Sequence, residues 1–193
     1  VDGNSRQLAR YIHGNVKQFM PKLNPMMIYR LDRFGRGGHH RPFNDLGYAG
    51  VRIMEAHENY NRQHQDIRKE NGIKYGDVIS GVNFQYAKSL TAVNAINLAS
   101  LGWSPEEPKN LKIGGIVEPS TKLKWDIQDD EGIIGYKIYW RNTTSPVWEN
   151  SKFVGKINDY TLEGVVIDNF LFGVSSVSKR GFESIIVFPD EIF

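Results

Sequence analysis

The sequence contains no cysteine, and it contains no histidine after His64. The absence of cysteine excludes disulfide bonds, thiolate metal ligands and a cysteine nucleophile, and it is compatible with either a reducing cytosol or an exported protein. The absence of histidine from residues 65–193 confines any chemistry based on imidazole to the first third of the chain.

The sequence also lacks a long apolar run and a strong charge of either sign. No apolar run approaches the roughly 18 residues of a membrane helix, so we expect no membrane partner. The net charge is +2, with 14 basic and 10 acidic residues up to Glu107 and 10 basic and 12 acidic residues after it. Because the basic residues are scattered, we expect no nucleic-acid partner. The chain starts without an initiator methionine or a signal peptide, and we expect it to be part of a longer protein.

The chain of 193 residues contains enough apolar residues to form packed cores, since 40% of its residues are hydrophobic and 12% are aromatic. Two prolines, Pro105 and Pro108, end the helical periodicity of the first half, and short alternating segments follow them. The sequence therefore predicts two domains, residues 1–107 and residues 108–193.

Helices and strands alternate in the predicted first domain. Apolar residues at helical spacing predict a helix from Ser5 to near Pro21 and a second, longer helix over residues 80–101. Arg41-Pro42-Phe43 is typical of a short helix start. Strands are predicted at residues 26–31 and 50–55, a glycine-rich loop follows the first of them, and residues 57–77 are predicted to be an irregular loop.

The predicted second domain has the pattern of a β-sandwich, in which short alternating segments are separated by turn residues. Trp125, Tyr136, Leu162 and Phe172 are its predicted core or corner residues, whereas Trp140 and Trp148 are either buried or exposed for stacking on sugars. The predicted strands lie at residues 111–113, 122–126, 135–141, 160–163, 170–177 and 184–188.

Four of the five histidines lie between Gly37 and Asp66, and this segment contains most of the residues that could form a functional site. Such loop histidines are solvated, hydrogen-bonded or ligands of a metal ion, and His64 has the carboxylates of Glu55, Glu58 and Asp66 nearby in sequence. A serine nucleophile is not expected, because the sequence contains no G-x-S-x-G motif. The spacing of the histidines alone leaves the metal site open, because there is no H-E-x-x-H motif.

The order of R-L-D-R-F-G-R-G-G-H-H-R-P-F, A-G-V-R-I-M-E and E-N-Y-N-R-Q-H-Q-D resembles the C-terminal part of a co-catalytic dizinc exopeptidase. That family contains bacterial zinc aminopeptidases and the related glutaminyl cyclases, and the second half of the chain resembles a fibronectin type III domain. The resemblance implies the last part of a three-layer α/β/α catalytic domain followed by an all-β sandwich. It also favours a periplasmic or secreted bacterial enzyme.

The resemblance assigns His64 as the last zinc ligand and places Tyr60 and His39 at the substrate. At this point the family usually has an acidic residue followed by a histidine, and in this chain His39 occupies the position of the acidic residue. The other zinc ligands and the catalytic glutamate of the family precede the region equivalent to Val1, so no catalytic residue is assigned in this chain. We expect zinc as the cofactor, with two ions in the parent enzyme and weak or no binding by this chain alone.

The expected function is therefore that of the C-terminal portion of a zinc aminopeptidase, inactive by itself, whose partners are a peptide substrate and the missing N-terminal half of the catalytic domain. Two alternatives remain open at this stage. One is a non-catalytic module that binds a protein or a glycan, and the other is an enzyme domain completed by a second polypeptide after cleavage.

Overall fold

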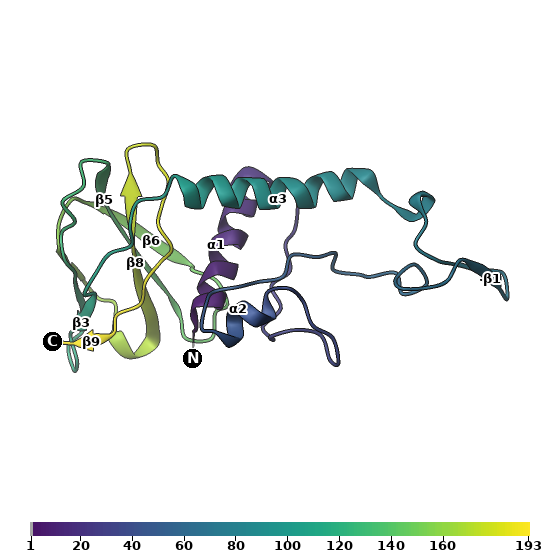
Figure 1. The fold of residues 1–193 in the computed structure, drawn as a ribbon. Helices are drawn as coiled ribbons and strands as arrows, with labels where there is room; N and C mark the ends of the chain where they lie inside the picture. The colour runs from purple at the N-terminus through teal and green to yellow at the C-terminus, as the bar shows by residue number, and fades with distance from the viewer. Residues whose placement is uncertain (1) are drawn as a thin grey trace. The chain divides into compact units, whose positions relative to one another are not determined.

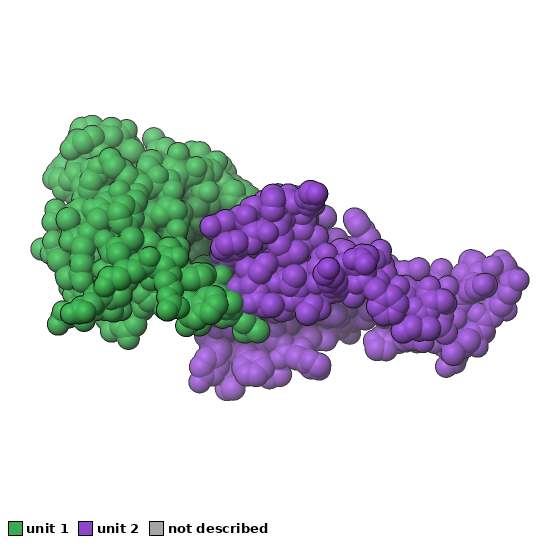
Figure 2. Space-filling model, turned by 90° about the horizontal axis from the view of Figure 1, so that it is seen from above, with its two compact units in different colours: residues 1–11, 98–193 green, residues 12–97 purple. Residues whose placement is uncertain are grey.

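The computed structural model describes residues 2–193, which form two compact units drawn in different colours in Figure 2. One unit comprises the residues up to Tyr11 together with Leu98–Phe193, and the other is Ile12–Asn97. No helix in the described residues is both long enough and apolar enough to cross a membrane. The division at residues 107 and 108 stays a prediction.

The first unit contains a sheet of four strands in the order β7-β4-β3-β9. These strands are β3 (Lys112–Gly114), β4 (Thr121–Lys124), β7 (Asp159–Leu162) and β9 (Glu191–Ile192). β4 pairs antiparallel with both β3 and β7, whereas β9 lies parallel to β3, which brings the end of the chain beside β3 (Figure 1).

A second sheet in the same unit has the order β6-β5-β8 and is antiparallel throughout. It comprises β5 (Ile133–Asn142), β6 (Asn150–Gly155) and β8 (Phe170–Ser178), and a short 3-10 helix, Ile167–Asn169, precedes β8. The predicted strands of this unit are confirmed in β3, β4, β5, β7 and β8, whereas β6 and β9 were not predicted.

The two sheets enclose one apolar core, as expected for a sandwich. The four predicted core residues are among its members: Trp125, Tyr136, Leu162 and Phe172 are all at most 5% exposed. A register shift beside Gly135 moves the inward positions of β5 from odd to even numbers, so that Ile133 and Tyr136 both face the core although they are three residues apart. Each such side chain contributes about 1.5–3 kcal/mol by its burial.

The predicted strand at residues 184–188 is wrong, because this segment makes a single isolated bridge to β8, between Val187 and Val174. Val187 and Val174 exchange two backbone hydrogen bonds of 3.0 Å, and Ser184 N–H donates to the carbonyl of Ser176. Between these contacts the carbonyl of Ile186 instead accepts the side-chain amide of Gln7, at 2.9 Å. A side chain of the first helix thus satisfies a backbone carbonyl of this segment.

Gln7 lies on α1 (Asn4–Phe19), which confirms the predicted first helix, and the first turns of α1 pack within the sandwich unit. Asp2 binds the guanidinium groups of Arg10, at 2.8 Å, and of Arg141 on β5. Arg10 also donates to the carbonyl of Pro146, at 2.7 Å. All three charged side chains are more than nine-tenths buried, so a buried ion-pair network fixes the start of the helix.

The second unit contains the rest of α1, the short helix α2 (Arg41–Asp45) and most of α3 (Phe84–Gly102). α2 confirms the helix predicted at Arg41. α3 confirms the predicted long helix but begins four residues later, because the side chain of Asn83 accepts the backbone N–H of Tyr86 and caps the helix there. Residues 79–81 form a separate 3-10 turn.

The strands predicted at residues 26–31 and 50–55 are wrong for this chain, since neither segment is a strand in the structure. Within the described residues 12–97 the sheet structure consists of a hairpin, β1 (Arg68–Glu70) with β2 (Ile73–Tyr75). An isolated extended segment lacks the ladder hydrogen bonds of a neighbouring strand, and apolar composition alone does not stabilise it. The expected three-layer α/β/α arrangement is therefore not confirmed by residues 2–193.

Candidate functional site

His64, the predicted zinc ligand, lies in an irregular segment before the β1–β2 hairpin, with an exposed imidazole. Its backbone has a φ of 53°, in the left-handed region that non-glycine residues rarely adopt. Its N–H donates to the carboxylate of Asp77, at 3.2 Å. The backbone at His64 is thus held in an uncommon conformation while the ring faces solvent.

The two residues predicted to face the substrate are also at the surface. Tyr60 is 66% exposed and belongs to a tight turn in which Arg62 N–H donates to the carbonyl of Asn59. His39 is exposed, whereas its neighbour His40 turns inward and its Nε2 lies 2.9 Å from the carbonyl oxygen of Leu31. Adjacent histidines thus have different environments.

The glycine-rich segment, residues 30–41, surrounds Asp32, whose side chain is 3% exposed. The N–H of Arg33 donates to Asp32 Oδ1, at 2.7 Å, and this hydrogen bond holds the pKa of the carboxyl below its usual range against the effect of burial. Arg33 Nε, His40 Nε2 and Arg52 Nη1 lie 3.6–3.8 Å from the same carboxylate. Asp32 is not among the site residues predicted from the sequence.

A second buried carboxylate, Glu58, joins the glycine-rich segment to the segment of His64. Arg33 Nη1 donates to Glu58 Oε1, at 2.9 Å, and Arg36 Nη1 lies 3.3 Å from Oε2, while the amide of Gln63 donates to Oε1, at 3.0 Å. Burial opposes ionisation, but the hydrogen bond from Gln63 and the charges of both arginines outweigh it and lower the pKa of Glu58. Glu58 is therefore bound to arginines, rather than being the carboxylate beside His64 that its position in the sequence suggested.

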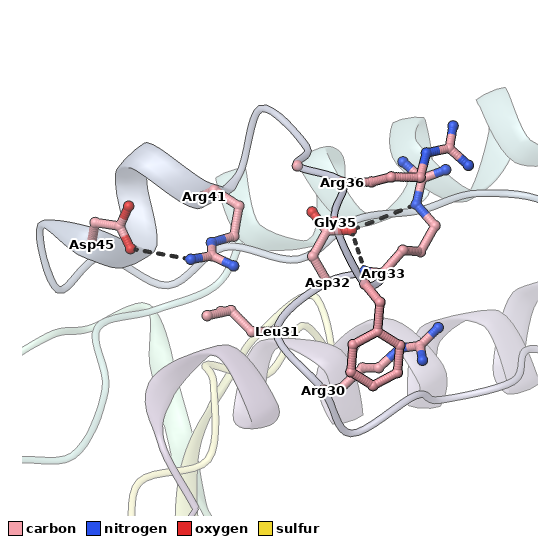
Figure 3. Close-up of a pocket in the computed structure, with 10 residues that line it drawn as sticks. Arg30, Leu31, Asp32, Arg33, Gly35, Arg36, Arg41 and Asp45 are labelled. Carbon is pink, nitrogen blue, oxygen red and sulfur yellow. Dashed lines mark hydrogen bonds and ion pairs between the residues drawn. The ribbon is translucent and has the colours of Figure 1, made fainter. Parts of the chain in front are cut away.

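A cavity of about 680 Å³ lies along the glycine-rich segment (Figure 3). Arg41 on α2 pairs with Asp45 at its rim, and Arg30 lies over the ring of Phe34 at 5.3 Å. Four guanidinium groups and two carboxylates line the cavity, but three of the guanidinium groups, those of Arg33, Arg36 and Arg41, are already paired with a carboxylate. The lining residues are Arg30, Leu31, Asp32, Arg33, Phe34, Gly35, Arg36, Gly37, Arg41 and Asp45. The predicted site residues His39, Tyr60 and His64 are outside this set.

Within the described residues no three histidine, aspartate or glutamate side chains come together as a group that could hold a metal ion. His64 supplies one available imidazole, and the carboxylate of Asp77 contacts its backbone rather than its ring. A zinc site needs at least three protein ligands, so the side chains of this chain do not by themselves fit the expected metal.

The sandwich unit carries a separate polar cluster around Glu183. Its carboxylate accepts Lys137 Nζ at 3.0 Å, the hydroxyl of Tyr139 at 2.5 Å and the hydroxyl of Ser175 at 2.9 Å. Burial raises the pKa of the Tyr139 phenol, and the charge of Glu183 raises it further. Every group of the cluster has a partner, which favours a structural role.

Trp140 and Trp148, the candidate residues for sugar stacking, are both half-buried. Trp140 packs against the core of the sandwich. Trp148 packs against Tyr139 and Phe188, with ring centroids 5.9 and 5.5 Å away. Neither ring forms the open aromatic platform that stacking on a sugar would require.

No family model matches this sequence. Among solved structures, the fibronectin type III domain of the human collagen alpha-1(XX) chain is 17% identical and covers 45% of this chain and 82% of that chain, with a TM-score of 0.36. A Fn3-like protein from Clostridium thermocellum is 21% identical and covers 43% of this chain and 85% of that chain, with a TM-score of 0.32. The strand order and the shared core identify the sandwich, and these similarities are not needed for it.

Curated relatives match the chain over nearly its whole length. A protein of the fungus Leptosphaeria maculans is 39% identical over 189 residues, which is 97% of this chain and 44% of that protein. Proteins of Pyrenophora teres f. teres and Pyricularia oryzae are 37% and 32% identical, again over 97% of this chain, and over 39% and 38% of their own lengths. All three are named probable zinc metalloprotease. The chain is thus similar to less than half of each of these proteins.

Proposed function

We propose that this chain is the C-terminal part of a zinc-dependent metallopeptidase. The observation that carries the proposal is the 39% identity over 189 residues to a protein named probable zinc metalloprotease, of which the chain spans less than half. The finer proposal is that the whole enzyme is a dizinc aminopeptidase that removes residues from the N-terminus of a peptide. That proposal rests on the resemblance of the segments around His39 and His64.

In this proposal the missing ligands come from polypeptide that corresponds to the uncovered part of the relatives. The exposed imidazole of His64 is the ligand that this chain contributes. The segments at residues 26–31 and 50–55, apolar yet not paired in a sheet, support the idea that further strands join them. Zinc supplies the Lewis acid and the activated water in enzymes of this class, once its ligand set is complete.

The assignment of His64 can be tested in the whole enzyme with a matched histidine of the same segment. We expect His64→Ala to lower the zinc content and to abolish hydrolysis, because a zinc ligand is lost. His57→Ala, at another exposed histidine, should leave both unchanged. Zinc is measured by mass spectrometry of the purified protein, and hydrolysis by release of nitroaniline from an aminoacyl-nitroanilide. Full activity and zinc content in His64→Ala would remove His64 from the site.

The same assay separates an aminopeptidase from other peptidases. An aminopeptidase should cleave the aminoacyl-nitroanilide and leave its N-acetylated form intact, whereas equal cleavage of both would contradict the finer proposal. For residues 1–193 alone we expect weak zinc binding and no turnover. Two tightly bound zinc ions on this chain would contradict the proposal that the site is completed from outside.

A further inference from the structure

Two irregular segments meet in the second unit without the support of a sheet. They are the glycine-rich segment, residues 30–41, and the His64 segment, residues 55–66. Irregular segments are mobile unless side-chain contacts fix them. The position of His64 therefore depends on what joins these two segments.

Glu58 makes the contacts that join them. Its side chain is 7% exposed and lies between the guanidinium groups of Arg33 and Arg36, which come from the glycine-rich segment. A buried carboxylate is stable only when it is paired and hydrogen-bonded, and Glu58 has bonds to both oxygens. The pairing is therefore a connection between segments that lie more than 20 residues apart in the sequence.

The third partner of Glu58 lies next to His64. The amide of Gln63 donates to Glu58, and the following residue, His64, donates its own N–H to Asp77. A backbone hydrogen bond of 3.0 Å from the N–H of Gly76 to the carbonyl of Asn61 connects the segment to the end of the β1–β2 hairpin. The backbone is thus held at Asn61, at Gln63 and at the N–H of His64, while the imidazole stays exposed.

We propose that Glu58 is a positioning residue for His64. Its ion pairs with Arg33 and Arg36 and its hydrogen bond from Gln63 hold the backbone of the His64 segment in place, with the imidazole exposed. The proposal rests on the proposed function only in taking His64 as a metal ligand. The contacts that hold the segment in place form within this chain and do not depend on a metal ion.

The test compares Glu58→Gln with Glu70→Gln in residues 1–193. Glu70 is a matched control in the same unit, because its pair with Arg68 lies at the surface with a side chain 60% exposed. Amide exchange by NMR reports on Arg62, His64 and Gly76, whose N–H groups are hydrogen-bonded in the segment. We expect Glu58→Gln to accelerate their exchange about tenfold and to shift the ring signal of His64, with the sandwich amides unchanged. Glu70→Gln should change none of these signals.

Unchanged exchange and an unchanged His64 signal in Glu58→Gln would overturn the proposal. If that variant does not fold, Arg36→Gln removes one 3.3 Å contact and should give a smaller acceleration in the same amides; no acceleration there would also overturn it. Titration with ZnCl₂ forms a separate arm. If zinc leaves the His64 signal unmoved in the wild type while Glu58→Gln still loosens the segment, the ligand assignment fails and the positioning role stands.

Discussion

Asp2 is a single carboxylate that binds two buried guanidinium groups, those of Arg10 and Arg141. We expect Asp2→Asn to lower the free energy of unfolding of the sandwich unit by about 3 kcal/mol, because the change leaves two buried charges without their anion. The control is Glu118→Gln, whose pair with Lys122 lies at the surface and should contribute less than about 1 kcal/mol. Urea unfolding followed by circular dichroism measures both, and equal effects of the two changes would contradict the role of the network.

The buried phenol of Tyr139 should make the free energy of unfolding fall at alkaline pH. Because burial and the neighbouring Glu183 raise the pKa of its phenol, the folded protein keeps this proton at a pH where the unfolded chain has lost it. The contribution is fully present below the ordinary tyrosine pKa of about 10 and is lost as the pH rises above it. Tyr139→Phe should remove this part of the pH dependence. A comparison of urea midpoints at pH 8 and pH 11 checks it, and an unchanged difference between the two would contradict the prediction.

Among the elements, β8 packs more tightly against its neighbours than the sequence indicates. A Cβ atom on Gly173 would lie 2.4 Å from Ile186 Cγ2 and 2.9 Å from the carbonyl oxygen of Val187. We expect Gly173→Ala to destabilise the sandwich by about 1–3 kcal/mol through this overlap. Gly14→Ala in α1, where nothing lies within 4 Å, should instead stabilise the protein by up to about 1 kcal/mol. Thermal melts of the two variants should shift in opposite directions.

The elements that the sequence predicts well are those whose partners lie within this chain. Trp125, Tyr136, Leu162 and Phe172 lie on short apolar segments between turns, and the two sheets bury them as predicted. Residues 26–31 have equally suitable composition, but a strand also depends on neighbours, and composition carries no information about whether they are present. The late start of α3 depends on Asn83, a capping signal that is readable in the sequence and was overlooked.

The candidate site was only partly predictable for a related reason. Histidines stand out in a sequence, so His39 and His64 could be selected, and their assignment stays a prediction. The contacts of Glu58 with Arg33 and Arg36 join charges that are far apart in the chain, and no spacing rule links them. The sequence does show charges of both signs within residues 30–36 and 55–58. Their presence alone does not specify which of them form ion pairs.

On the scale of the whole molecule, the second unit has large apolar side chains at its surface. Phe34 is 91% exposed, and Leu46, Ile67 and Ile79 are each at least 74% exposed. In the proposed enzyme, the polypeptide that completes the site would cover some of these side chains. On that proposal we expect residues 1–193 alone to bind a hydrophobic dye such as ANS and the longer protein to bind less of it per molecule. Equal dye binding by the two would contradict a covering polypeptide.

All four tryptophans belong to residues 98–193, and Trp125 is enclosed in the sandwich core at 1% exposure. Intrinsic fluorescence excited at the indole band therefore follows the sandwich unit and gives no direct signal from residues 12–97. A tryptophan introduced at Phe34, whose side chain faces solvent beside the arginines of the cavity, would provide the second unit with an optical probe of its own.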